Sequence, residues 1–252
     1  MRKVWIGTSG WTYDGWRGPF YPNDVPKKDW LRWYATQFSA TEINGSFYRT
    51  PSLDAVKAWR EQTPDDFRFA WKASKFITHW KRLSEKSDNS IELMVTRLKV
   101  LGPKIGPVLF QLPPQFKPNR ERLASFLKML PKRYSYTFEF RDPGWYEEPI
   151  LDVLRDRNVA LCLSDHHDAP SPWVVTSSLV YVRGHGPGGR YRDRYSAETL
   201  KDWARHIRKW RKQGREVYCF FDNDQKSAAP MDAAALAELL GMKRGSKARA
   251  AA

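Results

Sequence analysis

The sequence has 252 residues, and its 43 Lys and Arg against 28 Asp and Glu give a formal net charge of +15. This length can bury a large core, either as one α/β barrel or as two ordinary domains. No run of about eighteen apolar residues occurs, which excludes a membrane-spanning helix. The two cysteines, Cys162 and Cys219, each lie in an apolar run, which excludes a disulfide framework.

The first residues of the chain indicate its cellular location, and its excess positive charge indicates the kind of partner it could bind. The first residues contain no long apolar segment of the kind that directs secretion, so we expect a cytoplasmic protein with no membrane partner. The positive excess suits nucleic acid, a phosphorylated molecule or another acidic partner. A basic surface with no special partner explains it equally well.

In the first half of the chain, extended apolar runs alternate with segments whose apolar residues follow helical spacing. Strands are predicted at residues 4–7, 41–47, 67–73 and 106–112, and helices at 30–38, 53–61, 90–101 and 120–130. In the second strand, Glu42, Asn44 and Ser46 would share one face by the two-residue period. Residues 74–89 are predicted to form a long loop with a short helix.

The second half of the chain repeats this alternation. Strands are predicted at residues 136–141, 159–165, 179–183 and 216–222, and helices at 147–157, 197–213 and 231–240. The fifth strand places Glu139 and Arg141 on one face, and Asp142-Pro-Gly144 ends it. Residues 242–252 form a basic tail that we expect to be disordered.

Eight predicted strands separated mostly by helices favour one architecture. Within residues 1–241 they match a closed (β/α)8 TIM barrel in the α/β class better than two doubly wound halves. No Ser- or Gly-rich linker divides the chain, and no short internal repeat is evident. An open sheet of similar composition is the alternative.

Polar side chains stand at the predicted end of every strand. They are Ser9, Glu42, Asn44, Lys72, Gln111, Glu139, Arg141, Asp165, Arg183, His185 and Asp222. In a (β/α)8 barrel the carboxyl ends of all strands meet at one face, where active sites form. The sequence therefore predicts a site at this face.

Five short motifs follow one another along the chain. They are Ile6-Gly-Thr-Ser-Gly-Trp11 with Tyr13 and Trp16, Glu42-x-Asn44 running to Phe47-Tyr48, Lys72 running to Thr78-His79, Gly106-Pro-Val-Leu-Phe-Gln-Leu-Pro-Pro114, and Glu139-Phe-Arg141. In this order they resemble the DUF72, or YecE-like, family over about residues 3–240. The resemblance implies a TIM barrel, in agreement with the strand count, and no established reaction.

Two segments depart from the family pattern. Asp142-Pro-Gly144 stands where members often carry His-x-Ser, and Phe221-Asp-Asn-Asp224 stands where Phe-Asn-Asn is common. The resemblance therefore implies no role for a histidine after the fifth strand.

Four carboxylates are the main catalytic candidates. Glu42, Glu139, Asp165 and Asp222 follow four different strands, and a pair of them could act as general acid and base if their pKa values differ. Glu139 is the candidate base or ligand, and His185 is a candidate acid. The alternative is a buried ion-pair network, Glu139 with Arg141 or Lys72, that only fills the barrel mouth.

Several side chains, most of them in the second half of the chain, offer nitrogen and oxygen donors that could bind a divalent metal. Asp165-His-His-Asp168, with His79, His185 and Asp222, could supply a two-metal hydrolase, although the spacing matches no strong motif. In an extended chain His166 and His167 point to opposite faces, so we expect at most one of them as a ligand. Ser9 and Ser164 lack the Gly-x-Ser-x-Gly elbow of serine nucleophiles.

The loop from Arg183 to Arg194 is the strongest anion-binding signal. Its glycines would let backbone N–H groups approach an oxyanion, and its arginines offer bidentate donors. Lys72, Arg141, Arg183 and Arg190 are the predicted anion-binding residues. A flexible solvated loop is the alternative.

Most tryptophans occur at core spacing, but several aromatic residues fall in loops of the predicted active face. Trp11, Tyr13 and Trp145 are the residues that we expect to stack on a base or a sugar.

Three functions follow from these features. The first is a hydrolase acting on a phosphate-bearing substrate, either nucleic acid or a nucleotide. The second is a carbohydrate-processing barrel with paired carboxylates, which would make the protein a glycoside hydrolase. The third is a nucleic-acid-binding protein without catalysis.

Overall fold

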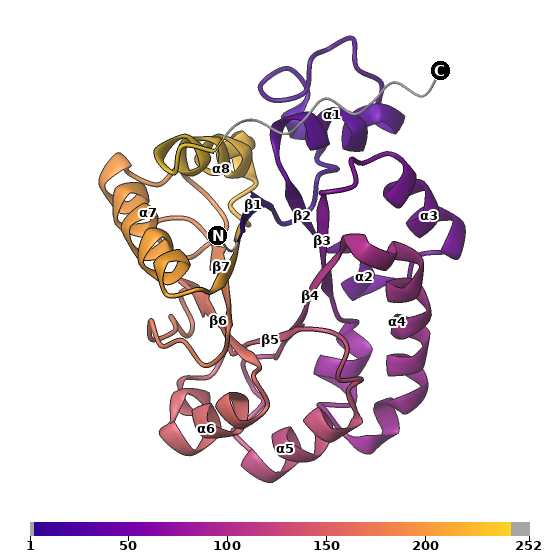
Figure 1. The fold of residues 1–252 in the computed structure, drawn as a ribbon, viewed down its shortest axis with the longest axis vertical. Helices are drawn as coiled ribbons and strands as arrows, with labels where there is room; N and C mark the ends of the chain where they lie inside the picture. The colour runs from indigo at the N-terminus through magenta and orange to yellow at the C-terminus, as the bar shows by residue number, and fades with distance from the viewer. Residues whose placement is uncertain (1–2, 243–252) are drawn as a thin grey trace.

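A computed structural model describes residues 3–242 and contains eight parallel strands in one sheet. The strands are β1 Val4–Thr8, β2 Ala40–Ile43, β3 Arg68–Lys72, β4 Ile105–Gln111, β5 Tyr136–Glu139, β6 Ala160–Ser164, β7 Leu179–Gly184 and β8 Glu216–Phe221. Their order, β1-β8-β7-β6-β5-β4-β3-β2, curls the sheet into the ring seen in Figure 1. The predicted (β/α)8 barrel is confirmed.

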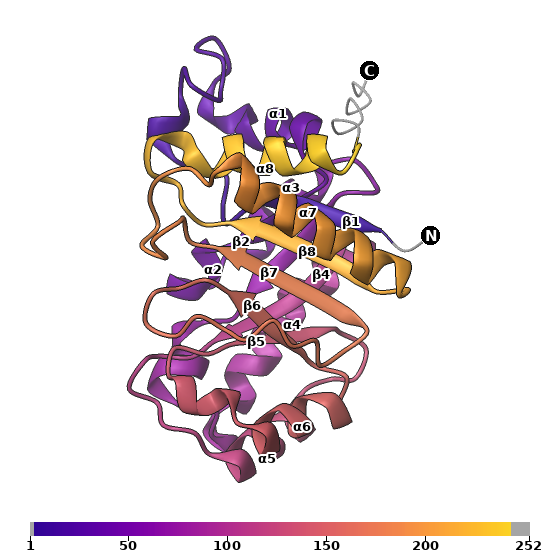
Figure 2. The ribbon, with the colours of Figure 1, turned by 90° about the vertical axis from the view of Figure 1, so that its left-hand side faces the viewer.

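The helices surround this ring (Figure 1). They are α1 Trp30–Gln37, α2 Gly45–Tyr48, α3 Leu53–Glu61, α4 Asp88–Leu101, α5 Arg120–Met129, α6 Glu148–Asp156, α7 Ala197–Lys212 and α8 Ala228–Leu239. Helix α7 packs on β8, and α8 packs on β1 and β8 (Figure 2). The β6–β7 connection, residues 165–178, contains no helix.

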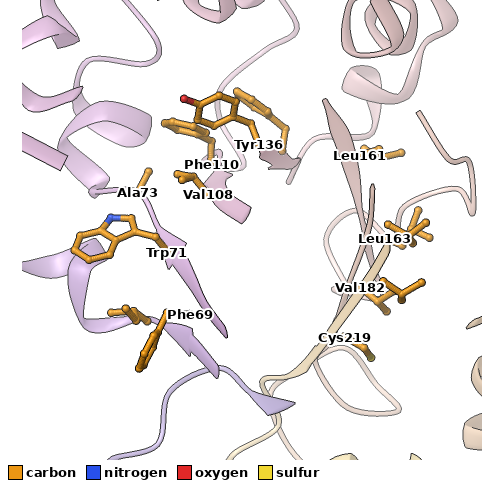
Figure 3. Packing of buried hydrophobic residues seen from close by; sticks show 14 of the residues in the cluster. Phe69, Trp71, Ala73, Val108, Phe110, Tyr136, Leu161, Leu163, Val182 and Cys219 are labelled. Carbon is orange, nitrogen blue, oxygen red and sulfur yellow. The ribbon is translucent and has the colours of Figure 1, made fainter. Parts of the chain in front are cut away.

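Successive side chains of each strand point to opposite faces of the sheet, which gives one core outside the barrel and one inside it. Side chains such as Phe69, Trp71 and Phe110 point away from the barrel toward the helices (Figure 3), as the two-residue period requires. The smaller inner core fills the barrel below the strand ends. It consists of Trp5, Ala40, Ala70, Leu109, Ala160, Cys162, Leu179, Tyr181, Tyr218 and Phe220.

One predicted strand is shorter in the structure, and the predicted tail lies mostly outside the described residues. The strand predicted over 41–47 is wrong after Ile43, because the chain turns into α2 and the Ser46 hydroxyl donates to the carbonyls of Ile43 (2.8 Å) and Lys72 (2.6 Å). The predicted tail, residues 242–252, lies outside the described residues apart from Met242. Within residues 3–242, no helix has the length and apolarity to cross a bilayer.

The seam between β1 and β2 closes the barrel with unusual contacts. One backbone bridge joins Ser9 to Glu42, and a Cβ on Gly7 would lie 1.9 Å from the Ala40 carbonyl oxygen, so only glycine permits this approach. Beside it, the buried Tyr34 hydroxyl accepts from the Thr8 N–H (2.8 Å) and donates to the Ala40 carbonyl (3.1 Å). A side chain of α1 thus substitutes for a direct hydrogen bond between the two strands.

We expect Tyr34→Phe to lower the free energy of unfolding by about 1–3 kcal/mol, because buried backbone groups of both seam strands lose a partner. Urea denaturation measures this change. Tyr218→Phe is the matched control, since its hydroxyl makes no hydrogen bond with the described residues, and it should change stability by less than about 0.5 kcal/mol. Equal effects of the two substitutions would contradict the role of Tyr34.

Candidate functional site

A fully buried arginine lies at the centre of the barrel mouth, the opening at the carboxyl ends of the strands. Arg183, on β7, donates from Nη1 to Glu139 Oε2 (2.7 Å) and from Nη2 to Glu42 Oε1 (2.9 Å) and Asp222 Oδ2 (2.7 Å). Nη2 also lies 2.9 Å from the Ser9 hydroxyl. One guanidinium therefore joins residues from β2, β5, β7 and the ends of β1 and β8.

Neighbouring hydroxyls hold Glu42 in this network. Its Oε1 accepts from the Ser9 hydroxyl, and its Oε2 accepts from the Tyr181 hydroxyl at 2.6 Å. The sequence interpretation missed Tyr181. Its position two residues before Arg183 on β7 is the signal that could have found it, because both side chains must point into the barrel.

Glu139 connects the central arginine to a second one. Its Oε1 pairs with Arg141 Nη2 at 2.7 Å and accepts from the Ser164 hydroxyl at 3.1 Å. Burial alone would raise the pKa of Glu139, but the Arg141 and Arg183 cations outweigh burial and hold the pKa well below its ordinary value. The expected Glu139–Arg141 ion pair is therefore present, and Glu139 is ionised.

His185 and Asp165 extend the network toward β6. The backbone N–H of His185 donates to Asp165 Oδ1 (2.7 Å), and His185 Nδ1 lies 3.2 Å from the same oxygen. If Nδ1 carries the proton, Nε2 is the acceptor for Arg183 Nη1 (3.1 Å) and Arg141 Nη2 (3.3 Å). Tyr195 donates to the other oxygen of Asp165. All polar atoms of the buried His185 ring are thus engaged.

Lys72 is the cation of the mouth that forms no direct ion pair with a described carboxylate. It is 8% exposed, and no carboxylate among residues 3–242 forms an ion pair or hydrogen bond with its ammonium. Its recorded contact is the Phe47 ring, 4.7 Å from Nζ to the centroid. Burial and then the Arg183 cation lower the pKa of Lys72.

Charges of opposite sign lie on opposite sides of the mouth. Near β3, burial and then the cations of Lys72 and Arg141 lower the pKa of His79 to about 4. After β8, burial and then the Asp222 carboxylate raise the pKa of Asp224. The mouth is therefore positive toward β3 and negative toward β8.

The structure brings together most of the predicted catalytic and anion-binding residues. They are Glu42, Glu139, Asp165, His185, Asp222, Arg141 and Arg183, with Lys72 beside them. Arg190 is exposed in the loop after β7 and lies outside the network. In that loop the N–H groups of Gly186 and Gly189 already donate to Tyr195 Oη and the Gly186 carbonyl, both at 2.8 Å, so they are not free for an oxyanion.

The prediction that Trp11 and Trp145 stack on a ligand is wrong, because both side chains are buried. Trp145 is 0% exposed, because it stacks on Phe140 and its indole N–H donates to the Phe116 carbonyl at 2.6 Å. Trp11 is also buried and packs edge-on against Trp59. Tyr13 is partly exposed, but its hydroxyl donates to the Ser9 carbonyl at 2.6 Å.

Two other aromatic residues, on either side of Lys75, are exposed. Tyr48 is 73% exposed and Trp80 is 67% exposed, and the ammonium of Lys75 lies within 5.8 Å of the first ring centroid and 5.6 Å of the second. Trp80 ends a π-helical turn, Phe76–Trp80, a geometry that often occurs at functional sites. We call Tyr48, Lys75 and Trp80 the aromatic platform.

The histidine pair after β6 also differs from expectation. Residues 167–168 form a turn, and the His166 and His167 rings lie 4.4 Å apart between centroids. Donor atoms of both histidines and of Asp168 lie within 4.8 Å of one another. The expectation of at most one histidine ligand assumed an extended chain, and that assumption is wrong.

The fold and this mouth define a (β/α)8-barrel protein with a buried, arginine-centred ion network at the carboxyl ends of its strands. The family model "Protein of unknown function DUF72" matches residues 5–252, so the chain belongs to the DUF72 family.

Named relatives and solved structures agree with this membership. The chain is 34% identical to the UPF0759 protein YecE of Escherichia coli K12, over 90% of this chain and 89% of that protein. It is 27% identical to YunF of Bacillus subtilis, over 95% of each. A DUF72 family protein of Thermotoga maritima has a TM-score of 0.85 and 25% identity, covering 94% of this chain and 99% of that one.

We expect Glu139→Gln to destabilise the protein by about 3–5 kcal/mol at pH 7, because two buried guanidiniums lose a charged partner. A carboxylate with a lowered folded-state pKa stabilises above its ordinary pKa of 4.5 and loses that stabilisation as pH falls below it. The difference from wild type should therefore shrink below pH 4.5. Urea denaturation across pH measures this.

Glu148→Gln is the control for this substitution. Glu148 pairs with Arg155 at the surface and should affect stability little at any pH. A stability difference for Glu139→Gln that is the same at pH 7 and at acidic pH would contradict the ion-pair account.

Proposed function

We propose that the barrel mouth binds a phosphate-bearing substrate, a nucleotide or the end of a single-stranded nucleic acid, and hydrolyses it by acid/base catalysis. The observation that carries this proposal is the buried amino group of Lys72, which forms no ion pair or hydrogen bond with a carboxylate among the described residues. A buried unpaired charge costs free energy that an anionic ligand would offset. A phosphate oxygen is such a ligand.

The neighbouring donors support the same position for the anion. The Nε of Arg141 is buried and has no hydrogen-bond partner among the described residues. Burial lowers the pKa of His79, and the cations of Lys72 and Arg141 lower it further, so the potential on this side of the mouth is positive. Lys72 and Arg141 together would hold the phosphoryl group, whereas Arg183 is already committed to three carboxylates.

The opposite side of the mouth supplies the acid/base group. The raised pKa of Asp224 lets it exchange a proton nearer to neutral pH than an ordinary aspartate. Asp224 would take a proton from the attacking water as the phosphorus–oxygen bond to the leaving group breaks, and solvent would protonate the leaving oxygen. Burial and then Asp222, which Arg183 anchors, keep the pKa of Asp224 raised. Glu139 and His185 are fully buried and would position Arg183 and Arg141 without touching substrate.

The aromatic platform favours a nucleotide among phosphate-bearing molecules. Two exposed rings with a lysine between them can stack on bases while the ammonium contacts a phosphate. Residues 72–84 include Lys72, Lys75, Lys81 and Arg82 and no acidic residue. The platform therefore has the charge complementary to a nucleic-acid backbone.

The carbohydrate alternative has less support. Glu42 and Glu139 are both fully buried and share the guanidinium of Arg183, which keeps the two carboxylates from acting as an acid and a nucleophile on a sugar. Nucleic-acid binding without catalysis would appear as binding of an oligonucleotide that yields no product.

We expect Lys72→Met to raise the free energy of unfolding of the ligand-free protein by about 1 kcal/mol and to weaken mononucleotide binding at least about tenfold. The reason is that methionine removes an uncompensated buried charge and, with it, the anion's partner. Thermal unfolding and calorimetric titration measure the two effects. If the variant is less stable and binds equally well, the assignment of Lys72 is wrong.

Matched variants separate phosphate recognition from base stacking. Lys201→Met removes an exposed lysine of α7 and should leave affinity unchanged. Trp80→Ala should weaken binding of a mononucleotide or a single-stranded oligonucleotide by about tenfold but not that of inorganic phosphate. Trp173→Ala, at another exposed tryptophan, should have no effect.

We expect Asp224→Asn to bind oligonucleotide normally but to lower its hydrolysis by about 10²–10⁴-fold, as loss of a general base does. In wild type the rate should fall as acid protonates Asp224, at a pH above its ordinary pKa of 3.8. Product analysis by chromatography measures this. Binding without any product from wild type would leave a nucleic-acid-binding protein and reject the hydrolase.

A further inference from the structure

The turn after β6 gathers three metal-ligating side chains that the proposed reaction does not use. His167 Nε2 lies 3.1 Å from Asp168 Oδ1, and His166 Nδ1 lies 3.7 Å from Asp168 Oδ2. The His166 side chain is buried, while His167 and Asp168 are 37% and 41% exposed. The cluster is therefore anchored on one side and open to solvent on the other.

Hydrogen bonds indicate which imidazole nitrogens carry lone pairs. His167 Nδ1 lies 3.0 Å from the Gly189 carbonyl oxygen, which accepts hydrogen bonds only, so Nδ1 carries a proton. In the neutral ring, Nε2 then has a lone pair beside a carboxylate oxygen. His166 Nδ1 accepts from the Asp168 N–H at 3.3 Å, so this nitrogen is unprotonated, and an ion bound there would displace that hydrogen bond.

Lone pairs this close to a carboxylate repel one another unless a proton or a metal ion lies between them. A backbone carbonyl that receives the second N–H of a histidine is also the usual arrangement around a metal-bound imidazole, because it fixes the tautomer and the ring orientation. With zinc–ligand bonds of about 2.0–2.1 Å, tetrahedral geometry places neighbouring ligands about 3.3–3.4 Å apart. The separations of 3.1 and 3.7 Å bracket that spacing.

The backbone of the loop after β7 holds this arrangement. Gly189 has a φ of +64°, and a Cβ there would lie 2.4 Å from the Asp165 carbonyl oxygen and 2.5 Å from the His167 nitrogen. Only glycine therefore lets the loop approach the turn closely enough for its carbonyl to reach His167.

We propose that His166, His167 and Asp168 bind one divalent transition-metal ion of the zinc type at the rim of the barrel mouth. Two imidazole nitrogens and one carboxylate oxygen suit Zn²⁺, Co²⁺ or Fe²⁺, whereas Mg²⁺ and Ca²⁺ prefer oxygen ligands. Three protein ligands leave a coordination position open to water or substrate. Binding of the ion does not depend on the reaction proposed above.

The site lies next to the central network. The His166 ring is 5.2 Å from the ring of His185, between centroids, and 5.5 Å from that of Tyr191. An ion held here would add positive charge beside Asp165 and His185. It would thus provide a second attachment for an anionic ligand whose other contacts are Lys72 and Arg141.

The experiment is calorimetric titration of untagged, metal-stripped full-length protein with Zn²⁺, with visible absorption of bound Co²⁺ as a second readout. We expect one ion per chain. His167→Ala and Asp168→Asn should each weaken binding at least about tenfold, and Gly189→Ala by about 10–100-fold through loss of the orienting carbonyl. Affinity should also fall as acid protonates the histidines.

His206→Ala is the matched control, because this histidine lies on α7 against Trp173 and away from the turn. It should bind Zn²⁺ like wild type. Circular dichroism shows whether each variant is folded, and Asp168→Asn changes the least volume if a histidine variant is not. Absence of binding, or binding that Asp168→Asn and His167→Ala leave unchanged, overturns the proposal, whatever the outcome of the nucleotide experiments.

Discussion

The buried guanidinium of Arg183 is the constraint on which the barrel mouth depends. A charge at 0% exposure is tolerated only when its counter-charges and hydrogen bonds are complete, since removal from water costs several kcal/mol. Carboxylates from β2, β5 and the end of β8 meet this requirement. The carboxyl ends of strands far apart around the ring are therefore held in fixed relation by one side chain.

This arrangement explains why Lys72, another cation of the mouth, forms no ion pair among the described residues. Lys72, Arg141 and Arg183 face Glu42, Glu139 and Asp222, so the formal charges of the six balance. The contacts are unequal, however, because all three carboxylates bind Arg183 and one of them also binds Arg141. The planar fork of arginine suits several carboxylates at once, whereas the compact ammonium of Lys72 is left for a ligand.

The sequence predicted the barrel and most of the residues that lie at its mouth, because both follow from the periodicity of the strands. Alternation along a strand is local, so Glu42, Glu139 and Arg183 could be placed on the inner face from the chain alone. The exposure of the loop tryptophans to solvent could not be predicted in this way. Trp145 is buried by Phe116 and Phe140, whose approach is a tertiary contact, while Trp80 is exposed by a π-helical turn that has no simple sequence pattern.

The connection between β6 and β7 extends the rim of the mouth beyond the strand ends. Residues 165–178 contain no helix, and the turn that follows β6 packs on the loop after β7. Asp165 ties the two together, since it accepts from the His185 backbone and from Tyr195. Any charge gained at this rim, by an ion or a proton, acts on His185 and through it on the two arginines that accompany Glu139. The turn is thus the part of the structure from which the electrostatics of the central network can be changed without altering the barrel itself.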